Sequence, residues 1–132
     1  MEPQKLKICI YGAGAIGGYL GVCFARSGAE VSLIARGPHL AAMRANGLTL
    51  VSEKGGRETV RLNCTDKAAE LGPQDFVVVA LKAHQVGDAA PAMRALLKPE
   101  TAILCAYNGI PYWYFYKHGG PFDGKQLESV DP

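Results

Sequence analysis

The sequence has no long hydrophobic run. Its only early apolar segment, at residues 8–11, is too short for the core of a signal peptide, and no later stretch could span a bilayer. Neither sign of charge dominates, because 14 Lys and Arg stand against 12 Asp and Glu and the basic residues are scattered. We therefore expect a cytoplasmic protein with no membrane segment and no nucleic-acid partner.

Closely spaced cysteines are missing as well. The four cysteines are Cys9, Cys23, Cys64 and Cys105. They form no C-x-x-C pair and share no metal-ligand spacing with the three histidines, which are His39, His84 and His118. Three of the cysteines lie in apolar segments, where a thiol behaves as a small hydrophobic group. We expect buried structural thiols and no metal site.

Short apolar segments alternate with helical ones along most of the chain, which has no internal repeat. Nearly continuous apolar runs predict strands at 7–11, 30–35, 76–81 and 101–106, the last also buried. Two further short strands, 48–53 and 58–63, flank a turn at 54–57 and predict a hairpin. A last short strand is expected at 126–130. Alternation of this kind predicts a single α/β domain with a doubly wound, mostly parallel sheet and helices on both faces.

Four helices are expected between these strands. The first begins at Ala15 and ends near residues 27–28, and its apolar stripe comprises Ile16, Leu20, Cys23 and Phe24. Pro38 suits the start of the second and Gly47 its end. A short one is predicted at 67–71. The last is expected to start at Asp88, as an N-cap, and to run to about residue 98, with Pro91 in its first turn.

A glycine-rich turn follows the first strand. Residues 12–17 are Gly12, Ala13, Gly14, Ala15, Ile16 and Gly17, which matches G-x-G-x-x-G. Gly12 allows a sharp turn off the strand, Gly14 lets a pyrophosphate approach the backbone, and Gly17 allows close packing of the helix. The N-terminus of that helix offers unpaired N–H groups to phosphates. Because the motif lies between a predicted strand and a predicted helix, we expect it to bind a dinucleotide.

The residue after the second strand indicates which dinucleotide. NAD and FAD sites hold the ribose hydroxyls with an acidic residue there, whereas this chain has Arg36 and no Asp or Glu between Glu30 and Glu53. A carboxylate would repel a 2′-phosphate, and a guanidinium can pair with it through two hydrogen bonds. We therefore predict NADP as the cofactor, the alternative being that Arg36 is an ordinary surface charge.

Three more polar residues follow predicted strands. Lys82 comes directly after the strand at 76–81, Gln85 lies one helical turn later, and Asn108 follows the strand at 101–106. Ligands of doubly wound sheets bind at the carboxyl ends of the strands. Each residue alone would more often be an ordinary loop residue, but together they are candidate cofactor-binding residues.

Four segments together resemble the ketopantoate reductase (2-dehydropantoate 2-reductase) family. They are KICIYGAGAIGG at 7–18, LIAR at 33–36, LKAHQV at 81–86 and NGIP at 108–111. The resemblance implies a Rossmann-type fold and NADPH-dependent reduction of 2-dehydropantoate, a 2-oxo acid, in pantothenate and coenzyme A synthesis. It also implies that the glycine turn binds pyrophosphate, that Arg36 contacts the 2′-phosphate, that Lys82 and Gln85 line the cofactor cleft, and that Asn108 lies near nicotinamide and substrate.

The resemblance also implies a helical C-terminal domain that no segment here matches. That domain carries the lysine general acid and an assisting glutamate of the family, so we assign no catalytic residue and expect residues 1–132 to be a truncated NADP-binding domain. Residues 112–132 form an aromatic, Gly- and Pro-rich tail, whose cluster at 112–116 we expect a further domain to cover. The alternatives are a non-catalytic NADP-binding module, with this cluster as an interface, and part of a related hydroxyacid dehydrogenase. The oligomeric state, including a homo-oligomer, stays open.

Overall fold

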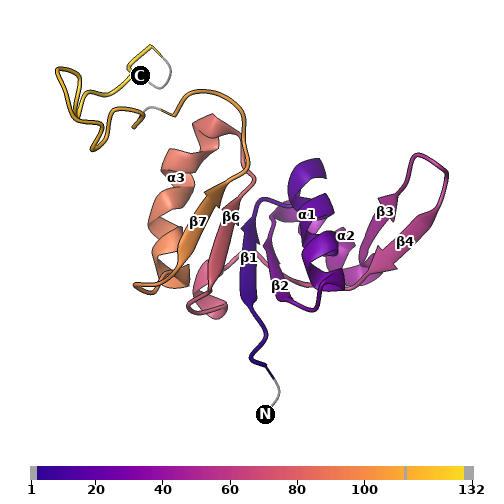
Figure 1. Cartoon of the computed structure of the whole chain (residues 1–132). Coiled ribbons are helices and arrows are strands. Elements are labelled where there is room, and N and C mark those ends of the chain that lie inside the picture. The colour runs from indigo at the N-terminus through magenta and orange to yellow at the C-terminus, as the bar shows by residue number, and fades with distance from the viewer. Residues whose placement is uncertain (1–2, 112, 130–132) are drawn as a thin grey trace.

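A five-stranded parallel sheet forms the centre of the computed structural model, which describes residues 3–111 and 113–129. Its strands are β1 (Lys7–Tyr11), β2 (Glu30–Ile34), β5 (Asn63–Thr65), β6 (Phe76–Val79) and β7 (Ala102–Cys105). Their order is β5-β2-β1-β6-β7, so successive strands extend the sheet first to one side of β1 and then to the other. Figure 1 shows β2 on one side of β1 and β6 and β7 on the other. The predicted doubly wound fold is confirmed, and its switch point lies between β1 and β6.

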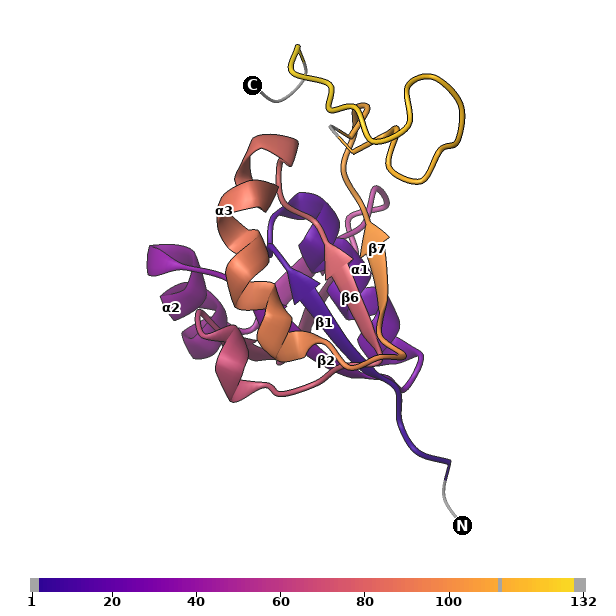
Figure 2. The ribbon, with the colours of Figure 1, turned by 90° about the vertical axis from the view of Figure 1, so that its left-hand side faces the viewer.

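Helices cover both faces of this sheet. They are α1 (Ala15–Arg26), α2 (Gly37–Asn46) and α3 (Ala83–Met93), with short 3-10 helices at Ala68–Glu70 and Arg94–Leu96. One core cluster joins α1 and α2 to the sheet, and a second joins α3 and the 3-10 helices to the opposite face. Figure 2 shows α3 and α1 on opposite sides of β1 and β6.

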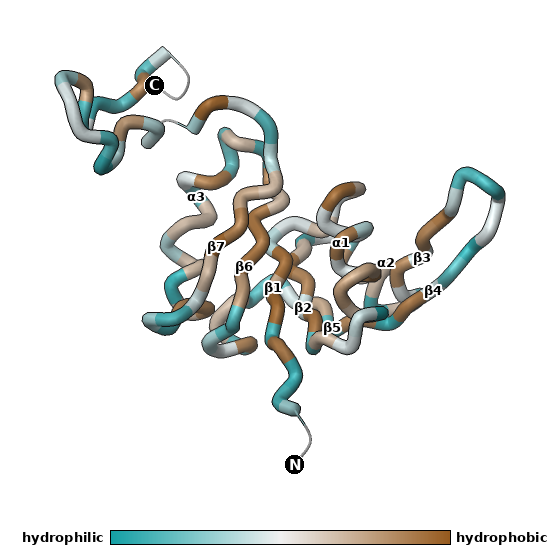
Figure 3. The backbone as a smooth tube through the Cα atoms, in the orientation of Figure 1, coloured by the Kyte–Doolittle hydropathy of each residue, from teal (hydrophilic) through white to brown (hydrophobic). Residues whose placement is uncertain are grey.

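The central strands are buried because their residues are apolar on both faces. Ile10, Leu33 and Val77 have no exposed surface, and Figure 3 shows β1, β2 and β6 as largely hydrophobic. Successive side chains of a strand point to opposite faces, so Cys9 belongs to the α3 side and Ile10 to the α1 side. The expected buried thiol is confirmed for Cys9. Burial raises the pKa of this thiol to about 12.

Small residues form the buried face of α1. Gly17, Gly18 and Gly21 are buried there together with Val22. Leu20 and Phe24 pack against the core as predicted, but Ile16 is 59% exposed. The predicted stripe was therefore wrong at Ile16, because glycines bring the helix backbone close to the sheet and turn larger side chains outward.

The predicted hairpin is present, formed by β3 (Leu48–Val51) and β4 (Arg57–Val60). Leu48 packs 3.3 Å from the position that a Cβ on Gly18 would occupy, and Arg26 of α1 forms an ion pair with Glu58. The second hairpin strand was expected to continue to residue 63, so β5 (Asn63–Thr65) was not predicted. That strand pairs with β2 at the edge of the sheet, a contact between distant segments that local pattern does not reveal.

Two expectations for helices need correction. Residues 68–70 form only a single 3-10 turn, and α3 begins at Ala83 rather than at Asp88. Its N-cap is Lys82, whose N–H donates to Oε1 of Gln85 over 3.2 Å, so a glutamine three residues on helps begin the helix. Pro91 therefore lies inside α3, where it lacks an N–H, and the helix ends two residues later.

The strand β7 has the predicted position but not the predicted burial. All four of its residues are exposed, and Ile103 and Leu104 are each 52% exposed. It is an edge strand paired only with β6 among the described residues, so its faces lie at the rim of both cores. The expected buried thiol is therefore wrong for Cys105, whereas Cys64 is buried and Cys23 half-buried.

The tail contains turns but neither helix nor strand between residues 113 and 129. The strand expected at 126–130 is absent from 126–129, and Val130 lies outside the described residues. Tyr112 of the aromatic cluster is also outside them, while Tyr114 and Tyr116 are 54% and 66% exposed. Phe115 packs within the tail, its ring 5.5 Å from that of Phe122. Within the described residues, no helix is long and apolar enough to cross a membrane.

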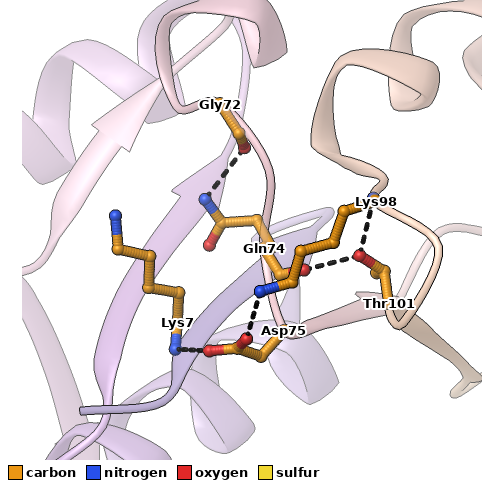
Figure 4. A network of polar contacts seen from close by, with 6 residues as sticks. All are labelled: Lys7, Gly72, Gln74, Asp75, Lys98 and Thr101. Atoms are coloured by element: carbon orange, nitrogen blue, oxygen red, sulfur yellow. Dashed lines mark hydrogen bonds and ion pairs between the residues drawn. The ribbon is translucent and has the colours of Figure 1, made fainter. Parts of the chain in front are cut away.

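Polar residues at the amino edge of the sheet bond to one another (Figure 4). The carboxylate of Asp75 accepts the N–H of Lys7 at 2.8 Å and the ammonium of Lys98 at 2.7 Å. The hydroxyl of Thr101 donates to the carbonyl of Gln74 at 2.6 Å and accepts the N–H of Lys98 at 2.9 Å. These bonds tie the starts of β1, β6 and β7 together.

Candidate nucleotide-binding site

A cavity of about 1300 Å³ lies at the opposite, carboxyl edge of the sheet. The loops after β1, β2, β6 and β7 line it, which is where the switch point of a doubly wound sheet predicts a ligand. Nine of the ten predicted site residues line this cavity: Gly12, Ala13, Gly14, Ala15, Ile16, Arg36, Lys82, Gln85 and Asn108. Gly17, the tenth, does not line it and lies behind the turn.

Steric limits require glycine at two of the three motif positions, and the third glycine faces open space. Gly12 has a φ of +107°, and a Cβ there would lie 2.9 Å from the carbonyl oxygen of Ala80. A Cβ on Gly17 would overlap the carbonyl oxygen of Gly12. No atom lies within 4 Å of the position of a Cβ on Gly14, so the space in front of this residue is open. Gly12 and Gly17 thus shape the turn, and Gly14 gives access to it.

Three helices begin at the cavity. Their N-caps are Gly14 for α1, Arg36 for α2 and Lys82 for α3, and all three residues line it. No Ser, Thr, Asp or Asn side chain caps these helices, and none has an acidic residue in its first turn. The positive ends of three helix dipoles therefore lie at one cavity, which favours an anion.

Arg36 stands where the sequence predicted it, directly after β2 at the start of α2. Its guanidinium forms no hydrogen bond or ion pair with the described residues, so its five donors remain for a ligand. Its charge acts on Tyr11. Burial raises the pKa of Tyr11, and the positive charge of Arg36 opposes part of this rise. A free guanidinium at this edge can bind a phosphate bidentately.

Several polar residues of the cavity were not among the predicted site residues. They are His39, Asp66, His84, Asp88 and Tyr107. Asp66 follows β5, which was not predicted, and His84 and Asp88 line the cavity because α3 begins earlier than expected. His39 had been considered only as a metal ligand, although its ring lies one helical turn after Arg36. No three His, Cys, Asp or Glu of the described segments gather into a metal-binding group.

Sheet order, glycine turn and cavity together define a Rossmann-type α/β domain. The family model of "Ketopantoate reductase PanE/ApbA" matches residues 8–112. The chain therefore belongs to the ketopantoate reductase family.

Relatives and solved structures agree with this assignment. The chain is 47% identical over 128 residues to a 2-dehydropantoate 2-reductase of Mesorhizobium japonicum, covering 96% of this chain and 39% of that protein. It is similar to the crystal structure of a Ralstonia solanacearum protein assigned to the ketopantoate reductases, with a TM-score of 0.87, 41% identity and coverage of 98% and 40%. The chain thus spans about two fifths of the length of these relatives.

A structure with a different activity is also similar. D-mandelate dehydrogenase, solved in a ternary complex with NADH and anilino(oxo)acetate, matches with a TM-score of 0.72 and 29% identity, covering 81% of this chain and 35% of that one. A similar fold therefore occurs in a protein that binds NADH, which lacks the 2′-phosphate.

Proposed function

We propose that this chain binds NADP(H) at the carboxyl edge of its sheet and acts as the nucleotide-binding part of a 2-dehydropantoate 2-reductase. The observation that carries the proposal is the free guanidinium of Arg36 beside a glycine turn with open space in front of Gly14. Family membership supports the class of reaction.

The residues present fit a dinucleotide. The cavity of about 1300 Å³ exceeds the roughly 300–1,000 Å³ of ordinary small-molecule pockets, as an extended ligand requires. The amide groups at the start of α1 suit a pyrophosphate, and the missing side chain of Gly14 lets it come close. Gly12, Ala13, Ala15, Ile16 and Gly17 complete this turn.

Arg36 favours the phosphorylated nucleotide. Its guanidinium would bind the 2′-phosphate through two parallel hydrogen bonds, a geometry that an acidic residue at the same place would oppose. The carboxylate of Asp66 also lines the cavity, at the end of the next strand, and accepts hydrogen bonds from amino or hydroxyl groups. We assign it to the nucleoside rather than to a phosphate.

The remaining residues lie where the reacting end would be held. Lys82 and Gln85 follow β6, and Asn108 follows β7 on the side of the switch point away from Arg36. The bound nucleotide would supply a hydride, and the amide of Asn108 would orient the nicotinamide and the 2-oxo acid. The reduction of 2-dehydropantoate itself is a proposal for the whole protein, because the chain spans about two fifths of its relatives.

The test compares Arg36→Ala with Arg57→Ala, an arginine of the hairpin that does not line the cavity. Titration of NADPH and NADH by nucleotide fluorescence should give a 10- to 100-fold weaker NADPH affinity for Arg36→Ala, about the value of a charge-assisted hydrogen-bonded contact. The NADH affinity should stay within about twofold, and Arg57→Ala should match the wild type. Equal NADPH affinity of wild type and Arg36→Ala would refute 2′-phosphate recognition.

A hydroxyacid dehydrogenase that uses NADH is the second candidate, favoured by the likeness to D-mandelate dehydrogenase. It predicts NADH affinity equal to or above that for NADPH. If the chain is a non-catalytic module, it should bind NADPH without turnover, both as the 132-residue chain and in a longer chain that contains it. In the 132-residue chain we expect no appreciable NADPH oxidation with 2-dehydropantoate, because the family's lysine and glutamate have no match here; oxidation at 340 nm should be measured with longer chains of the family alongside.

A further inference from the structure

His39 connects two parts of the cavity that lie far apart in the sequence. Its Nε2 is 2.6 Å from the carbonyl oxygen of Ala13, which belongs to the glycine turn. A carbonyl oxygen can only accept a hydrogen bond, so Nε2 carries the proton and donates it. The bond joins the first turn of α2 to the loop after β1.

The carbonyl that His39 holds belongs to the peptide unit between Ala13, which is buried in the core, and Gly14. This unit consists of the C=O of Ala13 and the N–H of Gly14, and no atom lies within 4 Å of the Cβ position of Gly14. Glycine adopts either sign of φ with few steric limits, so Gly14 by itself does not fix the orientation of this peptide. Turning over would exchange an N–H for a carbonyl oxygen at the wall of the cavity.

A planar trans peptide fixes the N–H opposite to its C=O. A histidine that holds the carbonyl oxygen of Ala13 on the α2 side therefore also fixes the direction of the N–H of Gly14. The hydrogen bond from His39 occupies the partly negative carbonyl oxygen on the side of α2. A phosphate in the cavity then meets N–H donors rather than a carbonyl acceptor.

The same bond fixes the start of α2 against the turn. Arg36 is the N-cap of α2 and His39 lies three residues later, in the first turn of the helix. The bond thereby links the glycine turn to the helix whose N-cap is Arg36.

We propose that His39 is a positioning residue whose Nε2–H holds the Ala13–Gly14 peptide in the orientation that binds a nucleotide diphosphate. The identity of the ligand rests on the function proposed above, whereas the hold on the carbonyl is a property of the protein without nucleotide. The role needs a donor at the Nε2 position and no positive charge.

Two amide variants separate this role from others. The side-chain nitrogen of Gln can occupy the place of Nε2, whereas that of Asn reaches only the place of Nδ1. Far-UV circular dichroism should first establish that both variants fold; His39 is exposed, which favours this. His118→Asn, in the tail, is the control.

The first measurement is the carbonyl ¹³C chemical shift of Ala13 by NMR without nucleotide. We expect it to change in His39→Asn and to return toward the wild-type value in His39→Gln. An unchanged shift in His39→Asn would overturn the proposal. This result does not depend on which nucleotide the protein binds.

The second measurement is the affinity for NADPH and NADH. His39→Asn should weaken both by about tenfold, the effect of losing one hydrogen bond, and His39→Gln should restore both to within about threefold. Loss of NADPH affinity alone, without rescue by Gln, would make His39 a phosphate ligand and overturn the positioning role. A wild type that does not prefer NADPH would refute the proposed function but leave the carbonyl measurement valid, and one that binds neither nucleotide would refute both.

Discussion

The two edges of the sheet differ in how many of their polar side chains bond within the protein. At the amino edge, Asp75, Lys98 and Thr101 satisfy one another and the backbone (Figure 4). At the carboxyl edge, the side chains of Arg36 and Asn108 form no hydrogen bond or ion pair within the described part of the chain. Polar groups that bond to one another stabilise the fold, and polar groups left open beside a cavity are available to a ligand.

This difference gives a rule for substitutions. Changes at the amino edge should affect stability and leave nucleotide affinity unchanged, whereas changes of Arg36 or Asn108 at the carboxyl edge should do the reverse. The glycine turn is where the rule should fail, because it both shapes the fold and faces the cavity.

The largest effect is expected for Gly17→Ala. A Cβ there would overlap the carbonyl oxygen of Gly12, a backbone atom that cannot move without opening the turn. We expect the free energy of unfolding to fall by about 3 kcal/mol, the upper range for overpacking, as measured by urea unfolding followed by circular dichroism. A change below about 0.5 kcal/mol, the level of ordinary surface substitutions, would contradict this assignment.

Gly14→Ala is the matched variant in the same motif. Its Cβ meets nothing within 4 Å, and the residue has an extended backbone that alanine can adopt. The free energy of unfolding should therefore stay within about 0.5 kcal/mol of the wild type. Affinity for NADPH and NADH should fall by more than about tenfold, because the methyl group occupies the space of the pyrophosphate. Unchanged affinity for both nucleotides would show that the pyrophosphate does not lie close to Gly14.

The smallest effect is expected for Asp75→Asn. The N–H of Lys7 and the ammonium of Lys98 lower the pKa of Asp75 from its usual 3.8. Its carboxylate therefore stabilises the fold above about pH 4, and this contribution disappears as the pH falls through the lowered pKa. Urea unfolding from pH 7 to pH 2 should give a less stable variant near neutrality and equal stabilities at the acid end.

Two controls accompany Asp75→Asn. Added salt should reduce the difference at pH 7, because the pair is exposed to solvent. NADPH affinity should match the wild type, since Asp75 lies at the opposite edge from the cavity. A stability difference between variant and wild type that does not depend on pH, or a loss of NADPH affinity in the variant, would contradict the contrast between the two edges.

Much of the fold could be predicted because it depends on local pattern. The bounds of β1 agree residue for residue, and α2 ends before Gly47 as expected but begins at Gly37, one residue before Pro38. The steric roles of Gly12 and Gly17 could be predicted from their spacing after a strand, whereas the role of Gly14 toward a pyrophosphate stays a prediction. Nine of ten candidate residues were brought to one cavity, since strand ends of a parallel sheet share one edge.

The errors concern contacts between distant segments. An apolar run such as β7 reads the same in the middle of a sheet and at its edge, so its sequence could not reveal that Leu104 is exposed. The three-residue β5 is too short to have a pattern and forms because β2 lies beside it. The start of α3 was misplaced because the glutamine side chain that caps it is a weaker signal than Asp88.

The amino-acid order by itself determined the alternation of strands and helices, the glycine-rich turn and the cation that follows β2. These depend on steric limits and polarity within a few residues. Only the tertiary structure decided that three helix starts meet at one cavity and that His39 donates to Ala13, 26 residues away. Such contacts arise from the packing of the whole sheet, which brings together groups that no local spacing relates.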